Sequence, residues 1–97
     1  MHVGVCRVRL HLPASESLKD KRQAIKSVTT RVRNSYNVSI AEIEDQDLWQ
    51  VSMLGIACTG PDPSVIRDLL CRIVDFIAGA RHDYELIESD IDVLSVF

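Results

Sequence analysis

The chain has 97 residues, of which 46% are hydrophobic and 26% charged, and its formal net charge is −3. This composition is typical of a globular protein and the length suits one domain, so we expect residues 1–97 to form a single domain. No stretch approaches the roughly 18 to 20 apolar residues that cross a bilayer, and Arg7 and Arg9 interrupt the first apolar run, unlike a signal peptide. The sequence therefore predicts a cytoplasmic protein without a membrane span.

The charges are divided unevenly along the chain. Residues 1–40 carry eight basic and two acidic side chains, whereas residues 41–97 carry three basic and twelve acidic ones. We therefore expect the folded domain to be bipolar, with one basic and one acidic surface.

The first part of the chain predicts a strand followed by an amphipathic helix. Residues 2–12 alternate between an apolar face and a face with Arg7 and Arg9, which is the pattern of a half-buried strand. Ser17 is placed to cap a helix over residues 18–34 by accepting a backbone N–H of its first turn. The apolar stripe of this helix comprises Leu18, Ala24, Ile25, Val28 and Val32.

The remaining chain predicts two strands, a second helix and a last strand. The strands are expected over residues 36–45 and 50–59, joined by an acidic loop. A second helix begins at Pro63, whose missing N–H costs nothing there, and Gly79 is placed to end it. Residues 84–95 predict a strand with carboxylates on one face and an apolar face comprising Ile87, Ile91 and Val93.

Two amphipathic helices interleaved with four strands can bury their stripes together on one face of an antiparallel sheet. We therefore predict an α+β fold, a two-layer ferredoxin-like sandwich in the order βαββαβ, with a four-stranded antiparallel sheet and two helices on one face. The first and last strands are then antiparallel neighbours. Arg7 and Arg9 are expected to lie opposite the carboxylates of the last strand, which are Glu88, Asp90 and Asp92.

The predicted first helix carries six basic side chains, most of them in one sector of the helix at about 100° per residue. These candidate phosphate-binding residues are Lys19, Lys21, Arg22, Lys26, Arg31 and Arg33. Such a ridge can lie along an RNA backbone and give salt-dependent binding. A charge run on a helix is more often simply a solvated face. The sequence leaves RNA binding and simple solvation open.

The sheet face away from the helices is expected to carry apolar side chains. The candidate interface residues are Val3, Val5, Trp49, Val51 and Met53, with Val38 and Ile40 as further candidates. The central strands lack the aromatic residues that stack bases in many RNA-binding ferredoxin-like domains. An exposed apolar patch would indicate a homodimer or a docked partner, and a monomer with scattered apolar groups is the alternative. A tryptophan in such a loop is more often a packing group that anchors the loop, which is the alternative for Trp49.

No constellation of residues predicts an active site. The three histidines lie on separate segments, and a catalytic pair assembled only in three dimensions stays open. The three cysteines are widely spaced and indicate neither disulfides nor a zinc site. An acidic group could bind a divalent cation, although such a loop is usually solvated; it comprises Glu42, Glu44, Asp45 and Asp47. We therefore predict no catalytic residue, no metal, no cofactor and no small-molecule substrate.

Five short segments share one resemblance. They are Met1-His2-Val3-Gly4-Val5, Ser17-Leu18-Lys19-Asp20-Lys21-Arg22, Asn37-Val38-Ser39-Ile40-Ala41-Glu42, Asp47-Leu48-Trp49-Gln50 and Leu54-Gly55. In this order and spacing they resemble the YlxP-like family of uncharacterised bacterial proteins. The resemblance implies a ferredoxin-like fold. Because the family's genes in many bacteria lie among those for a translation initiation factor and ribosome-binding factor A, it also implies an accessory role near the ribosome, with a ribosomal subunit or structured RNA as partner.

Overall fold

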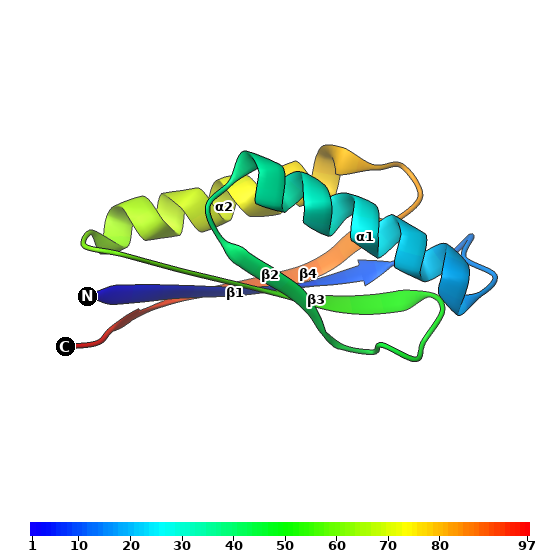
Figure 1. Ribbon diagram of the computed structural model, residues 1–97, viewed down its shortest axis with the longest axis horizontal. Helices are drawn as coiled ribbons and strands as arrows, with labels where there is room; N and C mark the ends of the chain where they lie inside the picture. The colour runs from blue at the N-terminus through cyan, green and yellow to red at the C-terminus, as the bar shows by residue number, and fades with distance from the viewer.

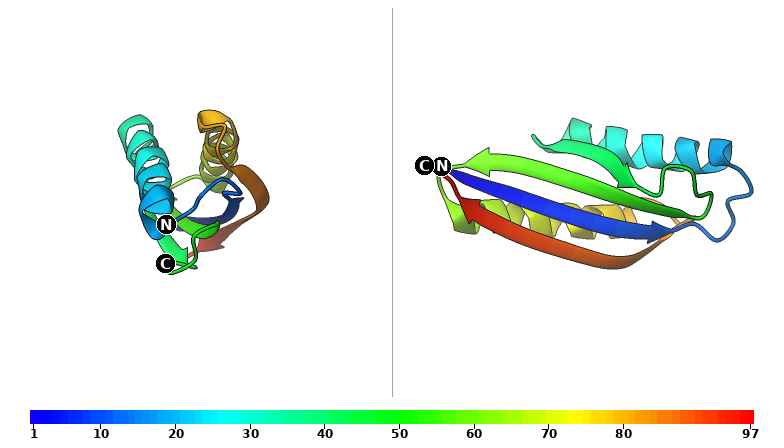
Figure 2. Two further views of the ribbon diagram at one scale, coloured as in Figure 1. Left: turned by 90° about the vertical axis from the view of Figure 1, so that its right-hand side faces the viewer. Right: turned by 90° about the horizontal axis from the view of Figure 1, so that it is seen from below.

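The computed structural model describes residues 1–97 (Figure 1). Its elements are β1 (His2–His11), α1 (Leu18–Ser35), β2 (Ser39–Glu44), β3 (Val51–Gly60), α2 (Pro63–Ala80) and β4 (Glu85–Ser95). The strands form one antiparallel sheet in the order β2-β3-β1-β4, and both helices cover the same face of it (Figure 2). The predicted ferredoxin-like sandwich is confirmed, and the other face of the sheet is left open.

Both helices begin at the residues that the sequence predicts. The Ser17 side chain accepts the backbone N–H of Asp20, and the Asp62 side chain accepts that of Ser64 ahead of Pro63. These bonds satisfy N–H groups that have no partner inside the helix. At its other end α2 runs one residue past Gly79, which does not adopt the left-handed conformation of a glycine cap.

The core lies between the helices and the inner face of the sheet. Apolar side chains at alternate strand positions pack against the stripes of both helices, and the cluster includes Cys6, Val8, Leu10, Leu54, Ile56, Ile25, Val28, Val32, Ile66, Leu70, Ile73 and Ile77. Gly4 lies on this inner face where α2 approaches closely. A Cβ atom at Gly4 would overlap Cγ2 of Ile66 and lie 2.9 Å from Cδ1 of Leu70, so the approach requires a glycine.

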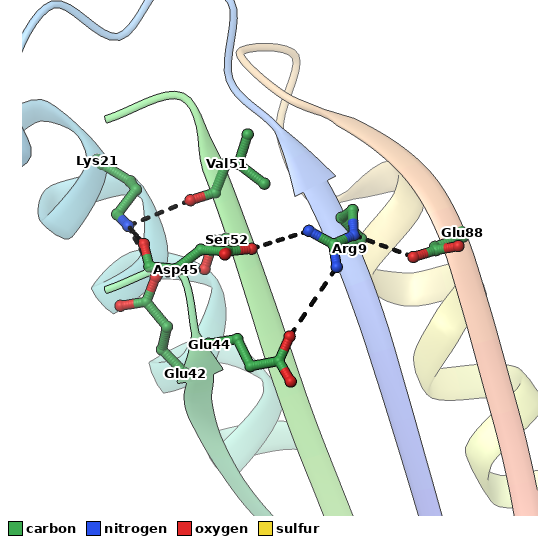
Figure 3. Close-up of polar contacts among 8 residues, drawn as sticks. All are labelled: Arg9, Lys21, Glu42, Glu44, Asp45, Val51, Ser52 and Glu88. Carbon is green, nitrogen blue, oxygen red and sulfur yellow. Dashed lines mark hydrogen bonds and ion pairs between the residues drawn. The ribbon is translucent and has the colours of Figure 1, made fainter. Parts of the chain in front are cut away.

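A buried lysine, Lys21, links α1 to the hairpin of β2 and β3 (Figure 3). Its side chain is 0% exposed, and its Nζ lies 3.0 Å from Oε2 of Glu42. The same ammonium donates hydrogen bonds to the backbone carbonyls of Asp45, Gln46 and Val51. The charge is therefore fully paired, as a buried ammonium requires.

The burial of Lys21 corrects the prediction that it belongs to a phosphate-binding surface. Lys21 lies one heptad before Val28 and four residues before Ile25, and both of these are core residues. It therefore occupies the middle of the apolar stripe of α1, where no phosphate can reach it.

A β-bulge corrects the predicted inner face of β4. Arg9 pairs with Glu88 but Leu10 pairs with Leu86, so Ile87 is an extra residue without a partner in β1. Leu86 takes the inward position that the alternation assigned to Ile87, and Ile87 is 54% exposed.

Replacing Lys21 with methionine is expected to lower the free energy of unfolding by about 3–5 kcal/mol, because Glu42 and three carbonyls lose their buried partner. Lys26→Met, on the exposed side of the same helix, should change it by less than about 0.5 kcal/mol. Urea unfolding followed by circular dichroism measures both. A Lys21→Met protein as stable as the unmodified chain would contradict the ion pair's role.

Two glycine substitutions should have opposite effects. Gly4→Ala forces a methyl group into Ile66 and should destabilise by about 1–3 kcal/mol. Gly79→Ala meets nothing within 4 Å and lies inside α2, so it should stabilise by up to about 1 kcal/mol. Thermal unfolding of the two variants in parallel checks the signs, and a stabilising Gly4→Ala would show that α2 can move away from the sheet.

Candidate functional site

The arginines of β1 form ion pairs across the open face of the sheet. Arg7 Nε lies 2.8 Å from Asp90 Oδ2, and the hydrogen bond raises the pKa of Arg7 above its ordinary value. Arg9 Nε lies 3.0 Å from Glu88 Oε1 and Arg9 Nη1 lies 2.8 Å from Asp45 Oδ2 (Figure 3). The predicted cross-strand pairing is confirmed, and both arginines are already bound to carboxylates.

The open face nevertheless has a surplus of negative charge. Against two arginines it carries six carboxylates, which are Glu44, Asp45, Glu85, Glu88, Asp90 and Asp92. Asp92 pairs with Val5 in the strand register and forms no ion pair. The face is therefore acidic even after its internal pairs are counted.

An apolar hollow of about 530 Å³ lies on the same face and is open to solvent. Its floor consists of small side chains at adjacent positions of β2 and β3, namely Ala41, Gly55 and Ala57. Ile43 packs against the backbone of Gly55 at one side. Val5 and the charged side chains Arg7, Asp90 and Asp92 border the opposite side.

The predicted interface residues differ in their exposure to solvent. Val5 and Trp49 are 37% and 52% exposed, and Val3 and Val51 are half-buried. Met53 lies on the open face but is only 2% exposed, so its assignment to a contact surface is wrong.

Burial likewise corrects the further candidate Ile40, which faces the helices and belongs to the core. The sequence reading missed Ile43, which is exposed on the open face. Glu42 points inward to Lys21, and the next residue, Ile43, is the unpaired residue of a bulge between Glu42 and Glu44 whose side chain lies over Gly55 on the open face. A reading that recognised Lys21 as a core position would have found this residue.

Three cations of α1 are exposed and make no ion pair or hydrogen bond to the protein. They are Lys19, Arg22 and Lys26, which we call the α1 cation row. Arg31 donates to the carbonyl of Ala80 and lies 5.7 Å from the ring centroid of Phe76. Arg33 donates to the carbonyl of Ile40 at 2.8 Å. Of the six predicted phosphate-binding residues, these three therefore have no partner within the protein. Arg31 and Arg33 donate hydrogen bonds to backbone carbonyls, and Lys21 is buried.

The two layers of the domain differ in charge. The exposed cations of the helices are Lys19, Arg22, Lys26, Arg31, Arg33, Arg67 and Arg72, and the helices carry only three carboxylates, Asp20, Asp68 and Asp75. The carboxylate surplus lies on the opposite side, on the open face of the sheet. The expected bipolar surface thus runs from the helical layer to the sheet.

No group of three or more His, Cys, Asp or Glu side chains is close enough to hold a metal ion. In the acidic group that the sequence singled out, Glu42 pairs with Lys21 and Asp45 pairs with Arg9. All three cysteines are free thiols, and burial raises the pKa of Cys6 to about 11. Neither helix is long and apolar enough to cross a membrane.

Residues 3–91 match a family described as a protein of unknown function (DUF503). The "Uncharacterized protein YlxP" of Bacillus subtilis (strain 168) is 44% identical over 61 residues; the match spans 63% of this chain and 66%, just under two thirds, of that relative. Among solved structures, the de novo designed protein Foldit4 has a TM-score of 0.53 at 18% identity, with 98% of this chain and 99% of that chain covered, and shares the fold alone. The predicted resemblance is confirmed, and the chain belongs to the DUF503 family.

Proposed function

We propose that this protein is an accessory protein that associates with structured RNA, in isolation or in a ribosomal subunit, through the α1 cation row. The observation that carries the proposal is that Lys19, Arg22 and Lys26 are exposed and unpaired on one side of α1. Cations without internal partners are free to replace the counterions of a phosphate backbone.

The distribution of charge supports this assignment over simple solvation. A chain with net charge −3 would be repelled by RNA if its carboxylates were spread evenly. Here the surplus carboxylates lie on the open sheet face, so the helical layer can approach a polyanion with its basic side. The gene neighbourhood that the family resemblance implies favours ribosomal RNA among possible RNAs.

Three phosphate contacts set the size of the expected effect. In a plot of log binding constant against log salt concentration, each phosphate contact makes the slope more negative by roughly 0.7 to 0.9. Three contacts therefore give a slope of roughly −2 to −3. Between 50 and 300 mM salt the affinity should then fall by roughly 40- to 130-fold. A fall of this size separates phosphate binding from apolar docking, which salt weakens little.

Replacing Arg22 and Lys26 together with glutamate should abolish binding, because it turns most of the α1 cation row negative. The matched control is Arg67→Glu with Arg72→Glu, which changes the net charge equally on the exposed side of α2. Co-sedimentation with ribosomal subunits and with naked structured RNA, across about 50 to 300 mM salt, measures both. Binding that survives the α1 reversal, or that salt does not weaken, would refute the proposal.

A second candidate function is protein docking through the open sheet face, which the apolar hollow favours. The occupant could be a second copy, giving a homodimer, or another protein. Two copies would bring the same six carboxylates toward each other, so the charge of the face disfavours the homodimer.

The solution mass tests the homodimer directly. We expect the 10.9-kDa chain to sediment as a monomer and Val5→Asp, which adds a charge beside the hollow, to leave its mass unchanged. A dimer that Val5→Asp dissociates would instead establish self-association through the open face.

A further inference from the structure

The hollow on the open face has the properties of a site for a large apolar side chain. Its volume of about 530 Å³ falls within the range of pockets that enclose small ligands. The floor is formed by Ala41, Gly55 and Ala57, so the space exists because three neighbouring positions carry almost no side chain. An apolar group seated there would remove this floor from water and be stabilised accordingly.

The charged side chains at the border of the hollow determine which charge is favoured in a group that binds there. Asp92 has no cationic partner, and Asp90 remains largely exposed although it pairs with Arg7. On the same face, Glu44, Asp45 and Glu88 all form ion pairs with a single cation, Arg9. An apolar floor beside a surplus of carboxylates, of which Asp92 is unpaired, favours a group that is apolar at its centre and positively charged around it.

We infer that the open sheet face binds a basic segment of a partner protein, in which a large apolar side chain fills the hollow and flanking lysines or arginines pair with Asp92 and Asp90. The inference rests on the docking role given above as the second candidate function, and it names the partner's chemistry. The α1 cation row takes no part in it, so RNA binding can fail or succeed independently.

Three synthetic peptides test the inference. The first has a central phenylalanine between lysines and arginines; the second has glutamates in place of the cations; the third has serine in place of the phenylalanine. Each is titrated into the ¹⁵N-labelled protein and followed by backbone amide shifts. We expect saturable shifts at Val5, Ala41, Ala57 and Asp92 with the first peptide, at an affinity at least tenfold higher than that of either control peptide.

Variants of the protein locate the contact. Ala57→Leu fills the hollow and should weaken binding of the first peptide at least tenfold, whereas Ala78→Leu on the exposed side of α2 should not. Asp92→Asn should weaken it severalfold, while Asp68→Asn on α2 is the matched control. Ala41→Leu, at an exposed position of β2, fills the hollow a second way if Ala57→Leu disturbs the fold.

Each adverse result has a distinct meaning. Equal binding of the basic and acidic peptides at the hollow would overturn the basic partner and leave the docking role standing. Shifts confined to other surfaces, or no shifts, would overturn the inference and remove the support that the hollow gives to docking. A concentration-dependent dimer lost in Ala57→Leu would assign the hollow to a second copy and overturn the inference.

Discussion

The contact between Lys21 and Glu42 is the constraint on which both surfaces of this protein depend. It places an ammonium ion in the apolar stripe of α1 and turns a carboxylate of β2 toward the helices. A buried charge tolerates little displacement, because any shift leaves it without its partner. The register of β2 and the course of the following loop are therefore fixed relative to α1, and so are the side chains that each element exposes.

The same contact connects the two candidate functions in physical terms. With Lys21 directed inward, the opposite side of α1 carries the α1 cation row, as helical geometry requires. With Glu42 directed inward, Ala41 and Ile43 of β2 lie on the open face, where Ala41 forms part of the floor of the hollow and Ile43 borders one side of it. The basic side of α1 and the acidic sheet face with its apolar hollow therefore both follow from the ion pair between Lys21 and Glu42. They lie on opposite layers of the domain, so their charges do not cancel.

The order of elements, the helix starts and the arginine–carboxylate pairs of β1 and β4 could be predicted from the sequence, because each depends on local periodicity or on topology. Lys21, Met53 and Ile87 could not be placed by polarity alone. Lys21 is buried because backbone carbonyls of a loop distant in sequence accept hydrogen bonds from its ammonium group. Ile87 is exposed because a bulge shifts the strand register by one residue. The hollow could not be predicted from the sequence, because it arises from small residues on two strands that become adjacent only through the sheet register.

The cysteines provide a means of labelling the helical layer alone. Cys6 is buried in the core and burial raises the pKa of its thiol, while Cys58 is half-buried with its pKa also raised. Cys71 is exposed on α2. Since thiolates are the reactive species, a maleimide dye should attach selectively at Cys71 without any engineered cysteine. A fluorophore there would sit on the helical layer of the native chain and leave the sheet face unlabelled.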